Sequence, residues 1–320
     1  MNISTKKLLP LAILVFLVSI SLTTAFRSIQ AQERDKTKEA ISKTDDSGKL
    51  NHQGKLRTYE LYTPSSYNAN RPMPLVMVFH GHDGTGASIA EVTRFNELAE
   101  KKGFIVVYPD GINHNWNLIG NYSGKEDDVS FVTALLDQMK QIRNIDSRKI
   151  YAAGFSKGAI FTQNLACELP DKFAAFASVA GALPVRLQPK CQPNTPVSML
   201  MINGTNDSAV LYEGDEINKK GALVSVPETV DFWLAHNKCT SPTEVKQLPT
   251  AKPNNRFKVQ LSRYSDCSNG SEVILDAILE GGHSWPGGAS KDASLNQFNA
   301  NLGFNASETI WNFFERHALR

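Results

Sequence analysis

Lys149-Ile150-Tyr151-Ala152-Ala153-Gly154-Phe155-Ser156-Lys157-Gly158 is the most informative segment of this chain. Its first five residues are mostly apolar and predict a short buried strand, and its last five match the pattern Gly-x-Ser-x-Gly. A strand that runs through this pattern into a helix predicts a nucleophile elbow, a turn so tight that only glycine fits beside the serine. The stretch therefore indicates covalent chemistry on esters or amides. An ordinary strand-to-helix turn would also match this pattern. The choice between the two interpretations depends on whether the rest of the chain supplies an acid and a histidine as partners for Ser156.

An acid and a histidine follow Ser156 in the order Ser, Asp, His that such a site uses. Asp207 comes after the apolar run 197–202, and His283 lies in a glycine-rich loop after the run 273–278. Open α/β sheets assemble their sites at the carboxyl ends of the strands, so we expect these side chains to meet. Taken singly, Asp207 also fits a turn residue and His283 a surface residue. Their common order and placement favour a catalytic triad.

The oxyanion hole is expected after an earlier strand, residues 75–79, which leads into His80-Gly81-His82-Asp83. The glycine lets the backbone turn so that an amide can face the serine. We expect the backbone N–H groups of His82 and Lys157 to be the donors. The alternating histidines and the aspartate also fit a zinc site, but the following residues 84–86 lack further metal ligands. We therefore expect neither a metal nor an organic cofactor.

Several motifs resemble one known family, and the most specific of them is Gly281-Gly282-His283-Ser284-Trp285-Pro286-Gly287-Gly288. The chain resembles the secreted esterases grouped as polyhydroxybutyrate depolymerase-like and feruloyl esterase-like proteins of the α/β-hydrolase superfamily. The resemblance implies that Ser156 is the nucleophile, His283 the general base and acid, and Asp207 the carboxylate that orients the imidazole. It extends from about residue 54 to the C-terminus, with further matches at 57–59, 74–81, 108–111, 116–117, 128–131, 150–158, 165–167, 173–181 and 204–207.

The chain departs from the family pattern beside the scissile bond. Relatives often have a small or amide residue at Lys157, a second glycine at Ala159, and a small residue or cysteine at His82. The acyl specificity of relatives therefore does not carry over. Trp116 and Trp285 are candidates to line the acyl- or sugar-binding cleft, although core packing would also explain them.

The N-terminus predicts export. Two lysines precede the apolar stretch 8–20 and then small residues up to Ala25, which is the order of a secretory signal peptide. We expect residues 1–25 to be that peptide, 26–51 a flexible polar leader, and 52–320 one α/β-hydrolase catalytic domain. The protein would then be extracellular or periplasmic, without stable membrane association after cleavage. An uncleaved membrane anchor is the alternative, although the stretch is short for a spanning helix.

Export agrees with the cysteine content. The chain has four cysteines, and an even number in an exported protein favours disulfides, for which three connectivities exist. We expect Cys167 to pair with Cys191 and Cys239 with Cys267. The formal net charge of +2 is too small to indicate a nucleic-acid partner.

Helical patterns alternate with the strand-like runs. Residues 128–142 carry one apolar stripe, 156–169 continue the elbow, Pro227 opens another helix, and Ser307 is expected to cap the last one. Strands separated by helices predict a mainly parallel sheet covered on both faces. The 320 residues, 41% of them apolar, can bury one large core.

These observations predict a secreted serine ester hydrolase that forms an acyl-enzyme. We expect it to act on small, oligomeric or polysaccharide-linked esters of the plant-wall type, such as feruloyl or acetyl groups on xylan. A depolymerase of hydroxybutyrate or other hydroxyalkanoate oligomers is the alternative. The final helix is followed closely by Arg320 without an adsorption module, which favours soluble esters over solid polymer. A non-catalytic binding protein on a hydrolase scaffold is a weaker alternative, since the triad residues are intact.

Overall fold

A computed structural model describes residues 45–118, 127–215, 221–249, 257–290, 299 and 302–320 of the chain. The predicted signal peptide, 1–25, and the leader up to residue 44 lie outside the described residues. Within the described residues, no helix combines the length and the apolar character that crossing a membrane requires.

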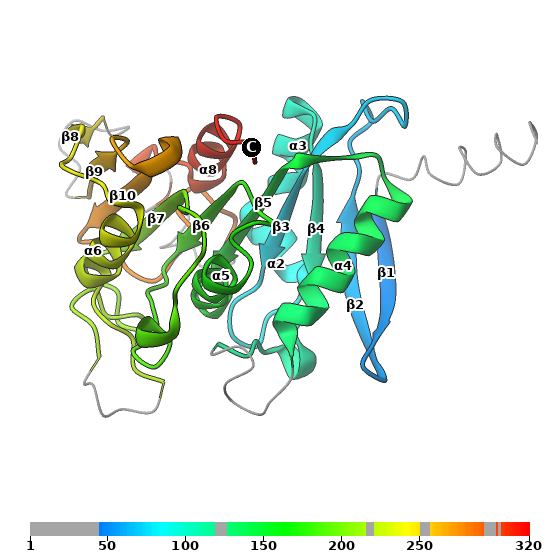
Figure 1. Ribbon diagram of the computed structural model, residues 1–320, viewed down its shortest axis with the longest axis horizontal. Helices are drawn as coiled ribbons and strands as arrows, with labels where there is room; N and C mark the ends of the chain where they lie inside the picture. The colour runs from blue at the N-terminus through cyan, green and yellow to red at the C-terminus, as the bar shows by residue number, and fades with distance from the viewer. Residues whose placement is uncertain (1–44, 119–126, 216–220, 250–256, 291–298, 300–301) are drawn as a thin grey trace, which may run out of the picture. The chain divides into compact units, whose positions relative to one another are not determined.

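A ten-stranded sheet organises the described residues, in the order β1-β2-β4-β3-β5-β6-β7-β10-β9-β8 (Figure 1). The strands from β4 to β10 in this order run parallel, and the pairs at both ends of the sheet are antiparallel. The mainly parallel sheet that the sequence predicts is therefore confirmed. Its strands are β1 Asp45–His52, β2 Lys55–Tyr62, β3 Met73–Phe79, β4 Ile105–Pro109, β5 Ile145–Phe155, β6 Ala175–Val179, β7 Met199–Gly204, β8 Glu244–Leu248, β9 Lys258–Tyr264 and β10 Val273–Leu279.

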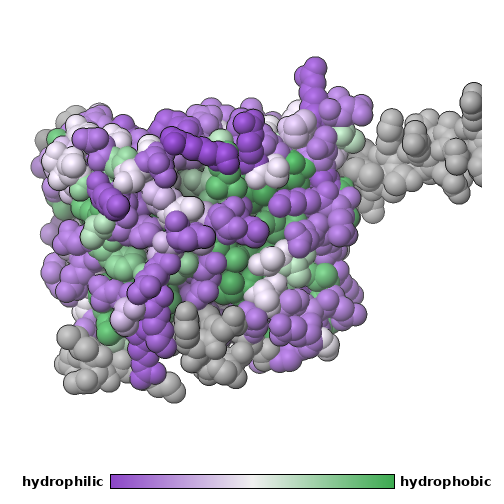
Figure 2. Space-filling view, viewed as in Figure 1, coloured by the Kyte–Doolittle hydropathy of each residue, from purple (hydrophilic) through white to green (hydrophobic). Residues whose placement is uncertain are grey.

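Helices cover both faces of the sheet, as the sequence predicts. Figure 1 shows α4, α5 and α6 in front of the strands, with α2, α3 and α8 behind them. In β3, Met77 packs into the front core and Val78 into the rear core, because successive side chains of a strand point to opposite faces. Polar side chains cover most of the face seen in Figure 2. The helices are α2 Gly86–Thr93, α3 Phe95–Lys102, α4 Asp128–Ile142, α5 Lys157–Glu168, α6 Val226–Asn237 and α8 Ala306–Phe314.

The last helix begins differently from our expectation. Asn305, not Ser307, is its N-cap, and the Asn305 side chain accepts a hydrogen bond of 3.0 Å from the Glu308 amide. Ser307 lies within the helix, where its hydroxyl accepts from the Trp285 indole and donates to the Thr93 carbonyl. Both residue types cap helices well, so only the packing of Ser307 against neighbouring segments decides between them.

Strand β1 corrects the predicted domain boundary, because it begins at Asp45 inside the segment expected to be a flexible leader. It pairs with β2 through a two-residue turn at Gln53 and Gly54, whose φ angles of 50° and 75° are those of a type I′ hairpin. Polar composition misled the prediction, since an antiparallel edge strand is held mainly by backbone hydrogen bonds. The boundary at residue 51 is therefore wrong for residues 45–51.

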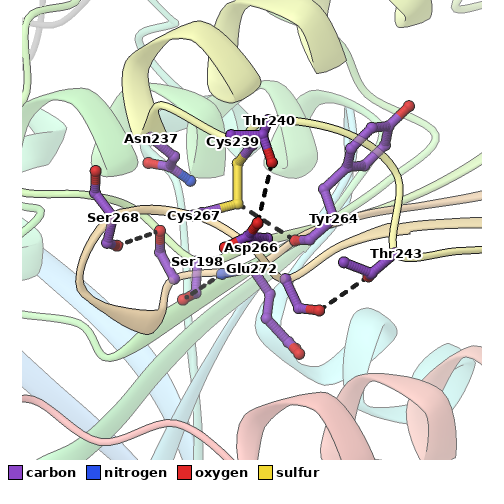
Figure 3. Close-up of a disulfide and its surroundings, with 12 residues drawn as sticks. Ser198, Asn237, Cys239, Thr240, Thr243, Tyr264, Asp266, Cys267, Ser268 and Glu272 are labelled. Atoms are coloured by element: carbon purple, nitrogen blue, oxygen red, sulfur yellow. Dashed lines mark hydrogen bonds between the residues drawn. A yellow bond between two sulfur atoms is a disulfide. The ribbon is translucent and has the colours of Figure 1, made fainter.

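The structure contains both expected disulfides. Cys167 at the end of α5 is bonded to Cys191, and Cys239 after α6 is bonded to Cys267 (Figure 3). The second bond ties the end of α6 to the segment between β9 and β10. Their sequence separations of 24 and 28 residues would each stabilise the fold by about 3 kcal/mol in the chain-entropy model.

One buried acid, Asp276 on β10, stands out in the rear core. It is fully buried, and neither carboxyl oxygen has a hydrogen-bond partner among the described residues. Burial raises the pKa of this carboxyl from 3.8 to about 7, and the charge of Arg263 acts in the opposite direction. The group therefore stays protonated in the folded protein at pH values where the unfolded chain ionises it.

Replacing Asp276 with Asn should change how stability depends on pH. Below pH 3.8 the Asp276 carboxyl is protonated in both the unfolded and the folded wild type, so its burial carries no cost of ionisation. Between pH 3.8 and about 7 only the unfolded chain loses this proton, so the wild-type protein loses stability as the pH rises. Because Asn cannot ionise, the difference in the free energy of unfolding between Asp276→Asn and the wild type should shift in favour of the variant by up to ~4 kcal/mol over this range. Calorimetric melting from acid to mildly alkaline pH measures this gain. A difference independent of pH would contradict it, and Asp137→Asn, at an exposed position of α4, is the control.

Candidate active site

Ser156 lies at the junction of β5 and α5 in a strained backbone conformation, with φ 53° and ψ −118°. Its amide donates to the Val179 carbonyl of β6, at 2.9 Å, which holds the turn against the sheet. A side chain at Gly154 would bring its Cβ to 2.2 Å from the Gly158 carbonyl oxygen. The elbow therefore needs its glycines for close backbone packing, as the sequence predicts, and such strain is common at functional positions.

The structure brings Ser156, His283 and Asp207 together. His283 Nε2 lies 2.8 Å from Ser156 Oγ, and His283 Nδ1 lies 2.8 Å from Asp207 Oδ2. Because the carboxylate can only accept, Nδ1 carries the hydrogen and Nε2 is free to accept the serine proton. The His283 side chain is 23% exposed, which leaves the Ser156–His283 contact accessible from solvent.

Asp207 is anchored independently of the histidine. Its side chain is 1% exposed, and Oδ1 accepts hydrogen bonds from the amides of Ala209 and Val210 at 2.8 and 2.9 Å. Two amide donors stabilise the ionised carboxylate inside the protein, so its negative charge is kept where the imidazole needs it. These donors belong to residues 209 and 210, which come directly after the turn-forming residues 203–207.

The loops that carry the acid and the histidine are bonded to each other. The Asn206 amide donates to the Gly281 carbonyl at 2.9 Å, and the Thr205 amide donates to the Ile278 carbonyl at 3.0 Å. These loops follow β7 and β10, which are adjacent parallel strands. Neighbouring strand ends thus place residues distant in sequence at one edge of the sheet.

His80 fixes the loop after β3. Its ring is buried, Nδ1 lies 2.7 Å from the Gly81 carbonyl, and Nε2 accepts from the Gly111 amide at 3.0 Å. Burial lowers the pKa of this imidazole, which agrees with a neutral ring that donates through Nδ1. Both nitrogens are thus engaged within the protein. The described residues contain no group of His, Cys, Asp and Glu side chains placed to hold a metal ion.

The two residues expected to provide the oxyanion hole flank the nucleophile. Lys157 is the first residue of α5, and the backbone N–H groups in the first turn of a helix have no acceptor within that helix. His82 follows Gly81, and a Cβ on Gly81 would come 3.3 Å from the Ser156 Cβ. The Gly81 carbonyl is turned to His80, so the His82 amide of the same trans peptide points the opposite way. The loop after β3 therefore packs directly against the serine.

Trp116 and Trp285 do not line an open cleft, so this expectation is wrong. Trp116 is 4% exposed, stacks on Phe161 at 5.0 Å between ring centroids, and donates its indole N–H to the His80 carbonyl. Trp285 is 3% exposed and donates its indole N–H to Ser307. Trp116 packs in the front core and Trp285 in the rear core, and each indole N–H has a hydrogen-bond partner there.

The sequence analysis did not single out two groups that support the site. Arg57 and Asp128 form a buried ion pair of 2.8 Å, and Arg57 also donates to the Asp110 carbonyl. Asn115 lies between the loop after β3 and the start of α5, in contact with His82 and Lys157. Arg57 and Asp128 lie within the segments 57–59 and 128–131 that resemble the family, and this could have marked them as supporting residues. The sequence signal for Asn115 was only its position beside Trp116.

Comparison with known proteins finds esterases among the similar chains. The family described as "Esterase PHB depolymerase" matches residues 57–185. The protein NocK of Nocardia uniformis subsp. tsuyamanensis, which is named as an esterase, is 28% identical over 253 residues, covering 73% of this chain and 72% of the relative. Feruloyl esterase D of Neurospora crassa is 26% identical over 278 residues, covering 83% of this chain and 84% of the relative.

A solved structure is similar in fold. The acetyl xylan esterase from Aspergillus awamori superposes with a TM-score of 0.56 at 15% identity, covering 80% of this chain and 98% of that chain. At this identity the likeness concerns the fold alone. The predicted α/β-hydrolase fold is confirmed.

Gly158 provides a test of the close packing at the elbow. A Cβ at this position would come 2.2 Å from the Phe79 carbonyl oxygen and 2.5 Å from that of His80. Helix propensity favours alanine by about 1 kcal/mol, but the clash with rigid backbone should outweigh it. Gly158→Ala should therefore lower the free energy of unfolding by about 2 kcal/mol or more, measured by urea denaturation.

The matched control is Gly282→Ala. Its Cβ would meet only the Asn206 carbonyl, at 3.8 Å, which is an ordinary contact. Equal stability losses in the two variants would show that the short contact at Gly158 is not what the elbow depends on.

Proposed function

We propose that this carboxylic ester hydrolase, as a member of the polyhydroxybutyrate depolymerase-like and feruloyl esterase-like esterases, works through a Ser156–His283–Asp207 triad. One observation carries the proposal: a single imidazole lies 2.8 Å from the serine hydroxyl and 2.8 Å from a buried carboxylate. A hydroxyl is a weak nucleophile until a base takes its proton, and the arrangement supplies that base. Core packing alone does not call for such a chain of contacts.

The reaction proceeds in two acyl transfers. His283 Nε2 takes the proton from Ser156 as the serine oxygen attacks the ester carbonyl, and it then gives that proton to the departing alcohol. Water next attacks the acyl-enzyme and loses a proton to His283. His283 then gives this proton to Ser156 Oγ as the bond to the acyl group breaks, which releases the acid product and restores the free serine. Asp207 keeps Nδ1 protonated and stabilises the imidazolium that forms at each step.

The tetrahedral intermediates carry a negative oxygen that needs donors. We assign this role to the backbone N–H groups of His82 and Lys157, which come from the loop after β3 and the start of α5. A donor of this kind typically stabilises the transition state by about 3 kcal/mol. The amino end of α5 also favours negative charge, because the helix dipole is positive there.

Plant-wall esters, such as feruloyl or acetyl groups on xylan, are the proposed substrates. A relative aligned over 83% of this chain is named feruloyl esterase D, which supports this class. The description "Esterase PHB depolymerase" of the matching family favours the second candidate, an oligomer of hydroxybutyrate. Both candidates are carboxylic esters. Two disulfides favour an oxidising compartment, so we propose that the protein is exported to the periplasm or the medium.

Substitution of the triad tests the mechanism. Ser156→Ala should lower kcat for p-nitrophenyl acetate by roughly 10⁶-fold, and Asp207→Asn by about 10⁴-fold, because Asn favours the wrong imidazole tautomer. Circular dichroism should show an unchanged fold in both variants. Turnover equal to that of the wild type in Ser156→Ala would reject the triad and favour a binding protein on a hydrolase scaffold.

A substrate panel separates the two ester classes. Methyl ferulate, acetylated xylan and a hydroxybutyrate trimer should be ranked by kcat/KM with the same enzyme preparation. We expect one of the plant-wall esters to exceed the trimer by at least about tenfold, which corresponds to ~1.4 kcal/mol of transition-state binding. A trimer hydrolysed faster than both would transfer the assignment to hydroxyalkanoate oligomers.

A further inference from the structure

The side chain of Asn115 contacts the two residues that we assign to the oxyanion hole. Its Oδ1 accepts a hydrogen bond from Lys157 Nζ and lies 3.2 Å from His82 Nδ1. We propose that Asn115 is a positioning residue that holds the His82 and Lys157 amides at the correct separation for a tetrahedral oxyanion. This inference rests on the proposed function and adds to it a residue that acts through His82 and Lys157.

The chemistry of the contacts determines how the Asn115 amide is oriented. Lys157 Nζ can only donate, so the oxygen of the Asn115 amide, and not its NH₂ group, must face it. His82 Nδ1 must then carry a hydrogen to bond with the same oxygen. His82 Nε2 faces Asp83 at 3.3 Å, on the far side of the ring. One amide oxygen thus joins donors from two separate elements.

Asn115 is itself held firmly, which a positioning residue requires. Its amide donates to the Ile112 carbonyl at 3.1 Å, and the neighbouring Trp116 is buried and bonded to the His80 carbonyl. Gly111 packs so closely that a Cβ there would come 2.2 Å from the Asn115 carbonyl oxygen. Because the backbone cannot shift freely, the side chain has a fixed origin from which to reach Lys157.

The segment that carries Asn115 is also fastened to the loop after β3. The Asp83 amide donates to the His114 carbonyl at 3.1 Å, and the Gly111 amide donates to His80 Nε2 at 3.0 Å. Residues 111–116 therefore move with the His82 side of the hole. The Asn115–Lys157 hydrogen bond then connects that side to the start of α5.

Such a connection matters because the two donors belong to different elements. Oxyanion donors act at about 2.7–3.1 Å, and a displacement of about 1 Å can cost 10²-fold in rate. Backbone packing of Gly158 against Phe79 and His80 sets the distance between the elements. The Asn115 contact adds a constraint on the His82 and Lys157 residues themselves, at the side chain rather than the backbone.

The test is a double-mutant cycle with Asn115→Ala and Lys157→Met. Both variants keep the backbone amides, so any loss must come through the side chains. Each single variant should lower kcat for p-nitrophenyl acetate by about 10- to 100-fold with KM within about twofold. Because both remove the same contact, the double variant should lose much less than the product of the single losses.

A second readout separates positioning from general destabilisation. Phenylboronic acid forms a tetrahedral adduct with an active serine and needs the same donors as the oxyanion. Its inhibition constant should rise by about the factor by which kcat falls in each variant, while the melting temperature stays within a few degrees. Lys101→Met on α3 and Asn51→Ala on β1, both exposed positions, are the matched controls and should change neither value.

The outcomes distinguish this inference from the proposed function. If the wild type hydrolyses the ester and Asn115→Ala retains its kcat and its boronate affinity, the positioning role is overturned and the triad stands. Multiplicative losses in the double variant would also overturn it, since the two side chains would then act separately. A wild type without esterase activity would overturn the function and the inference together.

Discussion

The chemistry that we propose for this site depends on one interaction, the hydrogen bond between His283 and Asp207. It determines which imidazole nitrogen carries the proton, and so leaves the other to accept the proton of Ser156. The bond is useful only because Asp207 is buried and held by two backbone amides. Without those amides, Oδ1 of this buried side chain would lose both of its hydrogen-bond donors, which is costly inside a protein.

The α/β fold supports this arrangement by bringing three strand ends to one edge. The serine follows β5, the acid follows β7 and the histidine follows β10, and hydrogen bonds join the last two loops. The strained backbone of Ser156 is tolerated because its surroundings leave no alternative: glycines at 154 and 158 allow contacts that any side chain would block. Rigid backbone packing therefore holds Ser156 in this conformation.

Local chemistry explains where sequence reasoning succeeded and where it did not. The elbow, the helix α4 and the disulfide pairs have patterns that depend on nearby residues or on cysteine number, and the structure contains them. The positions of Trp116 and Trp285 were harder to predict, because tryptophan occurs both in cores and in binding clefts and the sequence does not show which residues surround it. Strand β1 escaped prediction because edge pairing with β2 demands few apolar side chains. The cap at Asn305 was misplaced for a similar reason, since Ser307 is an equally suitable residue type.

The order of motifs predicted the fold class and singled out Ser156, Asp207 and His283 as one candidate site, because glycine geometry, strand periodicity and the Ser-Asp-His order are properties of the chain. Only the tertiary structure decided which groups hold those residues in place. Residues 80–84, 111–116 and the start of α5 meet through side chains that no periodic pattern marks, as the contact of Asn115 with Lys157 illustrates. Such contacts depend on how separate elements approach each other, and that approach is set by the packing of the whole core.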